Sequence, residues 1–194
     1  PNDPDSLLAD EEVLAANRRD DYMPYWASLW PAATDMATAL QHADWPAEAN
    51  VLEVGCGLGL VGIAGLLRGW DVLLSDYEPQ AVAATRVNAE RNGISVVRTA
   101  VLDWREPPAE RYPVILACDV LYEPRNHAPI LHLLSHALAA DGCAWIGEPG
   151  RTPAVDFHHS ATAAGFSITV RSATGDVQSF PTRGQFQLLE LRHG

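Results

Sequence analysis

From Asn50 onward the chain alternates between two hydrophobic patterns. Short apolar runs bounded by Gly, Asp or Asn predict buried strands, and longer segments with apolar residues every three or four positions predict helices. The expected strands are Val51–Val54, Val72–Ser75, Val96–Thr99, Val114–Cys118, Cys143–Gly147, Ser167–Arg171 and Gln185–Leu191. The expected helices are Ala32–His42, Leu60–Arg68, Gln80–Asn92, Pro129–Ala139 and Pro153–Ala164, and Asp141-Gly142 is expected to form the turn before the fifth strand.

This alternation predicts an α/β fold with a mainly parallel, seven-stranded sheet covered by helices on both faces. No helix pattern separates the last two expected strands, so we expect an antiparallel strand at the end of the sheet. We interpret 1–194 as a single domain. Within it, 50–194 form the α/β core, and 1–31 supply a helix (apolar positions Leu7, Leu8, Val13 and Leu14) followed by an aromatic segment that starts at Tyr22.

The net charge of the chain limits the kinds of partner that we expect. The formal net charge is -12, and all 13 basic Lys and Arg positions are arginines. Nucleic-acid binding relies on basic side chains that neutralise phosphates, so we expect no nucleic-acid partner. The absence of lysine also excludes Schiff-base and Walker-type chemistry.

The three cysteines, Cys56, Cys118 and Cys143, form no paired motif, which favours reduced thiols and a cytoplasmic protein. No apolar run approaches the length of a membrane span, so we expect no membrane association. His132 and His136 have helical spacing but no matching acidic or cysteine set, and we expect no metal site.

Parallel α/β sheets bind ligands at the carboxyl ends of their strands, so the residues after each strand are the candidates for a site. The first strand leads into Glu53-Val-Gly-Cys-Gly-Leu-Gly59, where three glycines let the backbone turn sharply and approach a ligand. Cys56 lies within this loop. The spacing of Gly57-Leu-Gly-Leu-Val-Gly62 also fits a nicotinamide dinucleotide fingerprint, although that register starts two residues late.

Acidic and aromatic residues follow the next strands. Asp76 is placed to accept hydrogen bonds from ribose hydroxyls, and Tyr77 to lie against an adenine. Asp103 and Trp104 form a similar pair that suits an adenine amino group and ring. The structural alternatives are a helix cap at Asp76 and a surface carboxylate beside a half-buried ring at Asp103 and Trp104.

The fourth strand ends in Ala117-Cys-Asp-Val-Leu-Tyr122. This run brings the carboxylate of Asp119 and, three residues later, the phenol of Tyr122 to the centre of the expected sheet. We interpret both as candidate catalytic residues.

Together these segments resemble the class I, Rossmann-like methyltransferases that use S-adenosylmethionine. More narrowly, they resemble methyltransferase family 16, a group of protein lysine methyltransferases and proteins described as nicotinamide N-methylase-like. The most specific features are Trp26–Pro31 before the first strand, Leu102-Asp-Trp104, and the D-x-x-Y pattern from Asp119 to Tyr122.

The resemblance implies a role for each of these residues. Those that would bind the cofactor are Trp30, Glu53, Gly55, Cys56, Gly57, Gly59, Asp76, Tyr77, Asp103, Trp104, Cys118 and Asp119. Among them, Trp30 would close the pocket from the N-terminal side. Asp119 and Tyr122 would face the methyl acceptor, and Glu148, with Arg151 as a weaker candidate, would line the same side.

Several acceptors and one other enzyme class stay open. The motif is not the N-P-P-Y type that acts on adenine or glutamine amides, and an acidic rim would attract a lysine-containing segment. We therefore expect a protein lysine N-methyltransferase. The alternatives are a small-molecule N-methyltransferase of an amine or pyridine-type nitrogen, a nicotinamide-dependent oxidoreductase, and a cofactor-binding protein without catalysis. The sequence does not indicate the oligomeric state.

Overall fold

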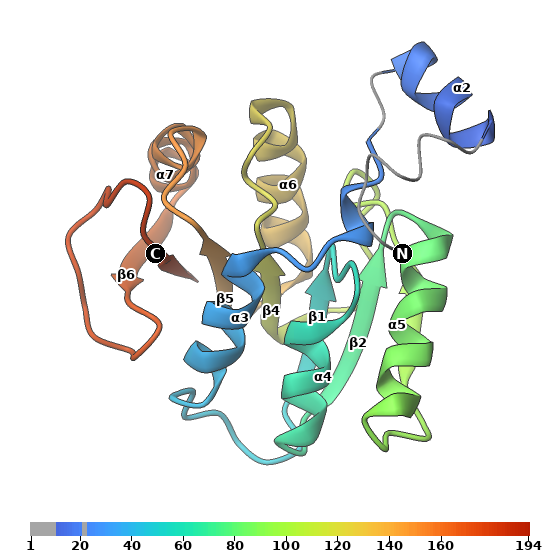
Figure 1. The fold of residues 1–194 in the computed structure, drawn as a ribbon. Coiled ribbons are helices and arrows are strands. Elements are labelled where there is room, and N and C mark those ends of the chain that lie inside the picture. The colour runs from blue at the N-terminus through green and yellow to red at the C-terminus, as the bar shows by residue number, and fades with distance from the viewer. Residues whose placement is uncertain (1–10, 21–22) are drawn as a thin grey trace.

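The computed structural model describes residues 11–20 and 23–194. Leu7, Leu8 and Tyr22, which the sequence placed in the N-terminal helix and the aromatic segment, lie outside these residues. The chain forms one seven-stranded sheet with helices on both faces (Figure 1).

The sheet has the strand order β3-β2-β1-β4-β5-β7-β6. Neighbouring strands from β3 to β5 run parallel, and β7 pairs antiparallel with both β5 and β6. The predicted mainly parallel sheet with an antiparallel terminal strand is therefore confirmed. The strands are β1 (Asn50–Val54), β2 (Asp71–Asp76), β3 (Arg98–Val101), β4 (Tyr112–Cys118), β5 (Leu138–Glu148), β6 (Phe166–Arg171) and β7 (Gln187–His193).

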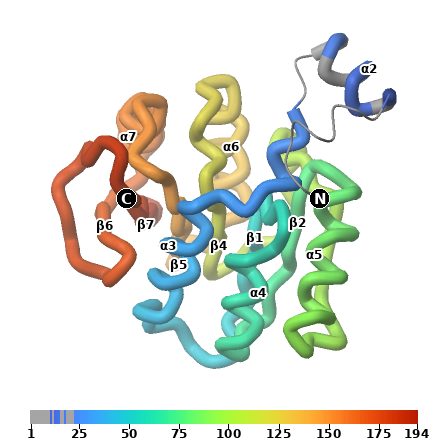
Figure 2. Tube along the Cα trace, in the orientation of Figure 1, coloured from blue at the N-terminus to red at the C-terminus, as the bar shows by residue number. Residues whose placement is uncertain are grey.

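Two layers of helices cover the sheet. On one face α3 packs beside α4, and α4 and α5 both contact β2; on the other face α6 packs beside α7. The tube in Figure 2 follows the chain through both layers, with α2 standing apart from the sheet. The helices are α2 (Glu11–Asp20), α3 (Pro31–Leu40), α4 (Leu60–Leu67), α5 (Pro79–Arg91), α6 (His127–Ala137) and α7 (Pro153–Ala163), with 3₁₀ turns η1 (Tyr25–Ala27) and η2 (Pro124–Asn126).

The alternation of side chains along each strand separates the core into two halves. In β1, Leu52 and Val54 pack into the half that contains α6 and α7, whereas Val51 packs into the half that contains α3 and α4. Both faces of the central strands are thus buried, which explains their continuous apolar runs.

Most expected boundaries differ from the structure by one or two residues, and two of the differences have a clear structural meaning. β3 begins at Arg98 rather than at Val96, whose side chain is 83% exposed. The predicted turn at Asp141-Gly142 is wrong, because β5 begins at Leu138 directly after α6 and runs through both residues. The fully buried Leu138 pairs with Tyr112, and a register shift between Tyr112 and Val114 accommodates the extra residues.

The strand order places the site. From β1 the chain moves outward to β2 and β3, and it then crosses back so that β4 lies on the other side of β1. The carboxyl ends of β1 and β4 are therefore neighbours at the point where the winding direction reverses, which is where open α/β sheets bind ligands.

Candidate functional site

A cavity of about 580 Å³ opens at this point of the sheet. Its walls come from the loops after β1, β2, β3 and β4 and from the aromatic segment that precedes α3. The predicted site residues that line it are Trp30, Glu53, Gly55, Cys56, Gly57, Asp76, Tyr77, Asp103, Trp104, Cys118, Asp119 and Tyr122.

The glycine loop after β1 is held in place by hydrogen bonds from neighbouring elements. Gly57 adopts φ 53°, a left-handed conformation that favours glycine, and its N–H donates to Oδ2 of Asp76 over 2.9 Å. The hydroxyl of Thr85 in α5 donates to the carbonyl of Gly57 at 2.9 Å. Gly59 lies outside the cavity lining and caps the N-terminus of α4. The loop thus presents a fixed backbone edge to the cavity.

Glu53 is a buried carboxyl group at the floor of the cavity. Its Oε2 has no hydrogen-bond partner within residues 11–20 and 23–194. Desolvation raises the pKa of Glu53 to about 8; the nearby backbone of Gly62 opposes the rise, and the charge of Asp76 adds to it. A buried, unpartnered acidic oxygen is costly, so this position suits a ligand that brings a positively charged donor.

Asp76 has partners for both oxygens. In addition to Gly57, the N–H of Glu78 donates to Oδ1 at 3.0 Å. Burial raises the pKa of Asp76, while the hydrogen bonds from Glu78 and Gly57 oppose that rise. A carboxylate oxygen accepts more than one hydrogen bond, so Asp76 retains capacity for a hydroxyl donor in the cavity.

Arg105 links the two acidic-aromatic pairs that the sequence singled out. Its Nε donates to both oxygens of Asp103 at 2.8 Å, and its guanidinium lies 5.5 Å from the ring centroid of Tyr77. The hydrogen bonds from Arg105 lower the pKa of Asp103, so this carboxyl group is ionised at neutral pH. Arg105 was not among the predicted site residues; its pairing with Asp103 is local, whereas its contact with Tyr77 depends on how the loops after β2 and β3 meet.

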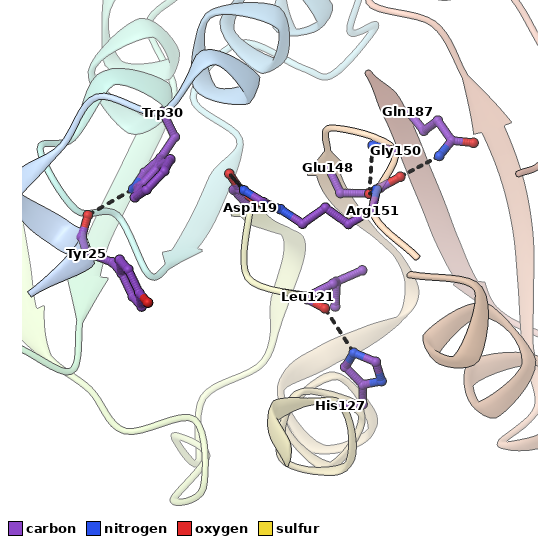
Figure 3. Close-up of polar contacts among 9 residues, drawn as sticks. All are labelled: Tyr25, Trp30, Asp119, Leu121, His127, Glu148, Gly150, Arg151 and Gln187. Carbon is purple, nitrogen blue, oxygen red and sulfur yellow. Dashed lines mark hydrogen bonds and ion pairs between the residues drawn. The ribbon is translucent and has the colours of Figure 1, made fainter. Parts of the chain in front are cut away.

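Three aromatic side chains that line the cavity, Tyr25, Trp30 and Tyr122, pack against one another. The ring of Tyr25 packs edge-on against Trp30 and Tyr122, with centroids 5.9 and 5.4 Å apart. The indole Nε1–H of Trp30 donates to the carbonyl of Tyr25 at 2.9 Å, as Figure 3 shows. Burial raises the pKa of Tyr122 to about 12, so this phenol stays protonated. Tyr25 was not among the predicted site residues, although the aromatic segment contains it.

Asp119 follows β4 in an uncommon backbone conformation. Its φ is 53°, in the left-handed region that non-glycine residues seldom adopt, and its N–H donates to the carbonyl of Gly147 at 2.8 Å. Both carboxylate oxygens face Arg151, with Nε–Oδ1 2.9 Å and Nη2–Oδ2 3.0 Å (Figure 3). Arg151 was only a weaker candidate in the sequence, and its pairing with Asp119 joins residues that are distant along the chain.

Glu148 lies outside the cavity lining. Its Oε2 accepts hydrogen bonds from the N–H groups of Gly150 and Arg151 at 2.9 and 2.8 Å, and its Oε1 accepts one from Nε2 of Gln187 at 2.5 Å. Both oxygens are therefore committed to the turn after β5 and to β7. We had expected Glu148 to face the acceptor, and this geometry instead makes it a support for Arg151.

Comparison with known proteins supplies the family. Residues 20–152 match the family model described as lysine methyltransferase. The chain belongs to this family. The match confirms the family that the sequence predicted and, with it, the methyltransferase class and the S-adenosylmethionine cofactor.

Two relatives of this chain have names that describe methyltransferases of proteins. The electron transfer flavoprotein beta subunit lysine methyltransferase of Danio rerio is 30% identical over 131 residues, 66% of this chain and 51% of that protein. The histone-arginine methyltransferase METTL23 of Xenopus laevis is 36% identical over 118 residues, 55% of this chain and 49% of that protein. The chain spans about half the length of these relatives.

A solved structure supports the fold. The TehB-like SAM-dependent methyltransferase of Corynebacterium glutamicum has a TM-score of 0.66 at 21% identity, covering 98% of each chain. The class I, Rossmann-like fold is therefore confirmed. Among the residues of this chain that the structure describes, none of the helices is both long and apolar enough to cross a membrane. Its described residues include no group of three or more His, Cys, Asp or Glu side chains that could hold a metal ion.

Proposed function

We propose that this chain transfers a methyl group from S-adenosylmethionine to the side-chain amine of a lysine in a partner protein. The observation that carries the proposal is the division of the cavity into two halves. Glu53 and Asp76 belong to β1 and β2 and Asp103 follows β3, whereas Asp119 and Tyr122 follow β4 on the other side of β1. The ring of Tyr25 packs against Tyr122.

The first half suits the cofactor. The unpartnered Oε2 of Glu53 would accept from its ammonium group, Asp76 would accept from its ribose hydroxyls, and Asp103 and Trp104 would hold its adenine. The bound cofactor supplies an electrophilic methyl group on a positively charged sulfur. Carboxylates and aromatic faces favour that positive charge over a neutral ligand.

The second half suits an amine acceptor. Attack on a sulfonium methyl group requires a neutral amine held in line with the carbon–sulfur bond, so orientation supplies much of the rate. The packed rings of Tyr25, Trp30 and Tyr122 line the cavity together with the carboxylate of Asp119. The high pKa of Tyr122 excludes its phenolate as the base at neutral pH.

Charge and family support a protein acceptor. Six acidic and two basic side chains line the cavity: Glu53, Asp76, Glu78, Asp103, Asp119 and Glu123 against Arg105 and Arg125. Glu53 is protonated at neutral pH, and Asp103 and Glu123 are paired with Arg105 and Arg125, so the attraction for cationic lysine-containing segments comes mainly from the net charge of -12 of the whole chain. The two relatives described above act on proteins according to their names, one on lysine and one on arginine.

The test uses radiolabelled S-adenosylmethionine, a cell lysate, and the wild-type and Asp119→Asn proteins. Asparagine tolerates the left-handed backbone of Asp119 and keeps its shape, so this variant removes the carboxylate without removing the turn. We expect wild type to label a protein band whose hydrolysate contains methyl-lysine, and Asp119→Asn to lose the label while it still binds S-adenosylhomocysteine. The enzyme has no lysine, so methyl-lysine comes from another protein. Label only in small molecules, or only in arginine, would contradict the proposal.

A further inference from the structure

Asp119 carries its side chain on a strained backbone. A left-handed φ costs a non-glycine residue about 1 kcal/mol or more, and such strain persists only where surrounding contacts over-determine it. The hydrogen bond from its N–H to the carbonyl of Gly147 fixes the backbone but leaves the carboxylate free to rotate. A second group is needed to set the plane of the carboxylate.

Arg151 provides that group. Its guanidinium meets Asp119 with two parallel hydrogen bonds of 2.9 and 3.0 Å, a geometry that fixes both the direction and the plane of a carboxylate. Asp119 lines the cavity, whereas Arg151 approaches from the turn after β5 and is not part of the lining. The Asp119 hydrogen bonds also raise the pKa of Arg151, which therefore remains charged.

Arg151 is itself held by a chain of hydrogen bonds that leads to β7. Its backbone N–H and that of Gly150 donate to Oε2 of Glu148, and Nε2 of Gln187 donates to Oε1 of the same carboxyl group. Gln187 is anchored in turn, because its Oε1 accepts from the N–H of Thr182 at 2.6 Å. The antiparallel end of the sheet thus supports the Asp119 carboxylate through Glu148 and Arg151.

We infer that Arg151 is the positioning residue of the methyl-transfer site: it fixes the direction and plane of the Asp119 carboxylate on the acceptor side of the cavity and is braced by Glu148 and Gln187. The inference rests on the proposed function, because Asp119 is given its role there. It assigns no contact between Arg151 and either the cofactor or the acceptor.

The first experiment removes the guanidinium with Arg151→Ala and compares turnover, cofactor binding and chemical rescue. We expect kcat for the labelled partner to fall by about tenfold or more, with the affinity for S-adenosylhomocysteine within about twofold of wild type. Arg151 is 40% exposed, so a small cation has access to its place. Ethylguanidinium is expected to restore turnover, and ethylammonium at the same concentration is not, because it cannot form the two parallel hydrogen bonds.

Two further variants distinguish the effect of the two parallel hydrogen bonds from that of the positive charge and from a general loss of stability. Arg151→Lys keeps the charge but offers a single point donor, so we expect turnover well below wild type. Arg171→Ala is the matched control. Arg171 makes a comparable ion pair with Glu190 at 2.8 Å, on β6 and β7 and away from the cavity, so its loss is expected to leave turnover unchanged.

Wild-type turnover in Arg151→Ala would overturn the inference, and so would a loss of turnover that ethylguanidinium does not restore. A crystal structure of Arg151→Ala with S-adenosylhomocysteine tests it without any acceptor. An Asp119 carboxylate that keeps its wild-type direction there would overturn the inference, whereas a rotated or disordered one supports it. If wild type labels no protein lysine, the proposed function fails, and this structural result still decides the role of Arg151.

Discussion

The backbone N–H of Gly57 donates a hydrogen bond to Oδ2 of Asp76, so one carboxylate both holds the glycine loop and faces the cavity. The loop after β1 and the end of β2 are thereby joined at the floor of the candidate cofactor site. A change at Asp76 therefore acts on the ligand contact and on the loop together.

Replacement of Asp76 by alanine tests this double role. We expect affinity for S-adenosylhomocysteine to fall by more than about tenfold, about 1.4 kcal/mol, because the ribose acceptor and the Gly57 hydrogen bond are both lost. Titration calorimetry measures the affinity. Asp71→Ala, at the exposed start of the same strand, is the control and should bind as wild type does. Equal affinity for wild type and Asp76→Ala would contradict the assignment.

Glu53 gives the unliganded protein a characteristic pH dependence. The group ionises near 4.5 in the unfolded chain but holds its proton to about pH 8 in the folded protein. Between these values the unfolded chain binds fewer protons, so the contribution of Glu53 to the free energy of unfolding falls as pH rises, by up to about 1.4 kcal/mol per pH unit.

Glu53→Gln removes this titration and should flatten the decline. Urea unfolding of both proteins from pH 5 to pH 8 measures the difference, which is expected to favour the variant increasingly at high pH. If the free energy of unfolding changed with pH equally in both proteins, the raised pKa would not belong to Glu53.

The buried position of Gly62 in α4 also leads to a prediction. A Cβ at this residue would collide with Oε2 of Glu53 and would lie 2.5 Å from Cδ2 of Leu74. Gly62→Ala is expected to destabilise the fold by about 1–3 kcal/mol through overpacking, which exceeds the helix-propensity gain of about 1 kcal/mol. It should also weaken the binding of S-adenosylhomocysteine, since Glu53 is displaced.

Gly69→Ala is the comparison for Gly62→Ala. Gly69 has φ +91° with open space around it, so alanine there strains the backbone without touching the cavity. Thermal unfolding and calorimetry of both variants should show a loss of stability in each but a loss of affinity only in Gly62→Ala. Unchanged affinity in Gly62→Ala would argue against Glu53 as a cofactor ligand.

Tyr25 separates acceptor effects from cofactor effects. Its ring lies against Trp30 and Tyr122, whereas its carbonyl accepts the Trp30 hydrogen bond. Tyr25→Ala removes the ring and keeps the carbonyl, so we expect KM for the acceptor to rise several-fold, about 1 kcal/mol for one aromatic contact, with cofactor affinity retained. Tyr25→Phe keeps the ring and should resemble wild type in steady-state assays. If Tyr25→Ala lowered the affinity for the cofactor and left KM for the acceptor unchanged, the assignment of Tyr25 to the acceptor side would be wrong.

The local pattern of apolar and polar residues was sufficient to predict most strands and helices of the fold. Each central strand is buried on both faces, so its apolar run was visible in the sequence, and the carboxylates of Asp76 and Asp119 follow directly where those runs stop. The turn expected at Asp141-Gly142 failed because Asp and Gly usually end an element, whereas here the long β5 continues through them. Burial of Leu138, a tertiary effect, outweighed that local preference.

The parts of the site that escaped prediction depend on contacts between distant segments. Arg151 meets Asp119 only because the turn after β5 folds toward the end of β4, and Glu148 was expected at the acceptor although Gln187 in β7 holds it. Neither pairing leaves a periodic or spaced signal in one sequence. Arg105 and Tyr25 were also missed; each has a local partner, but their contacts with Tyr77 and Tyr122 join separate segments of the chain.

The adjacency of β1 and β4 has a mechanical consequence. A Cβ on Gly55 would meet Cγ1 of Val120 at 3.1 Å, so the loops that follow these strands are in van der Waals contact. A displacement of one loop is passed to the other without an intervening solvent layer. Binding of the nucleoside and binding of the acceptor are therefore coupled, and each ligand is expected to change the affinity for the other.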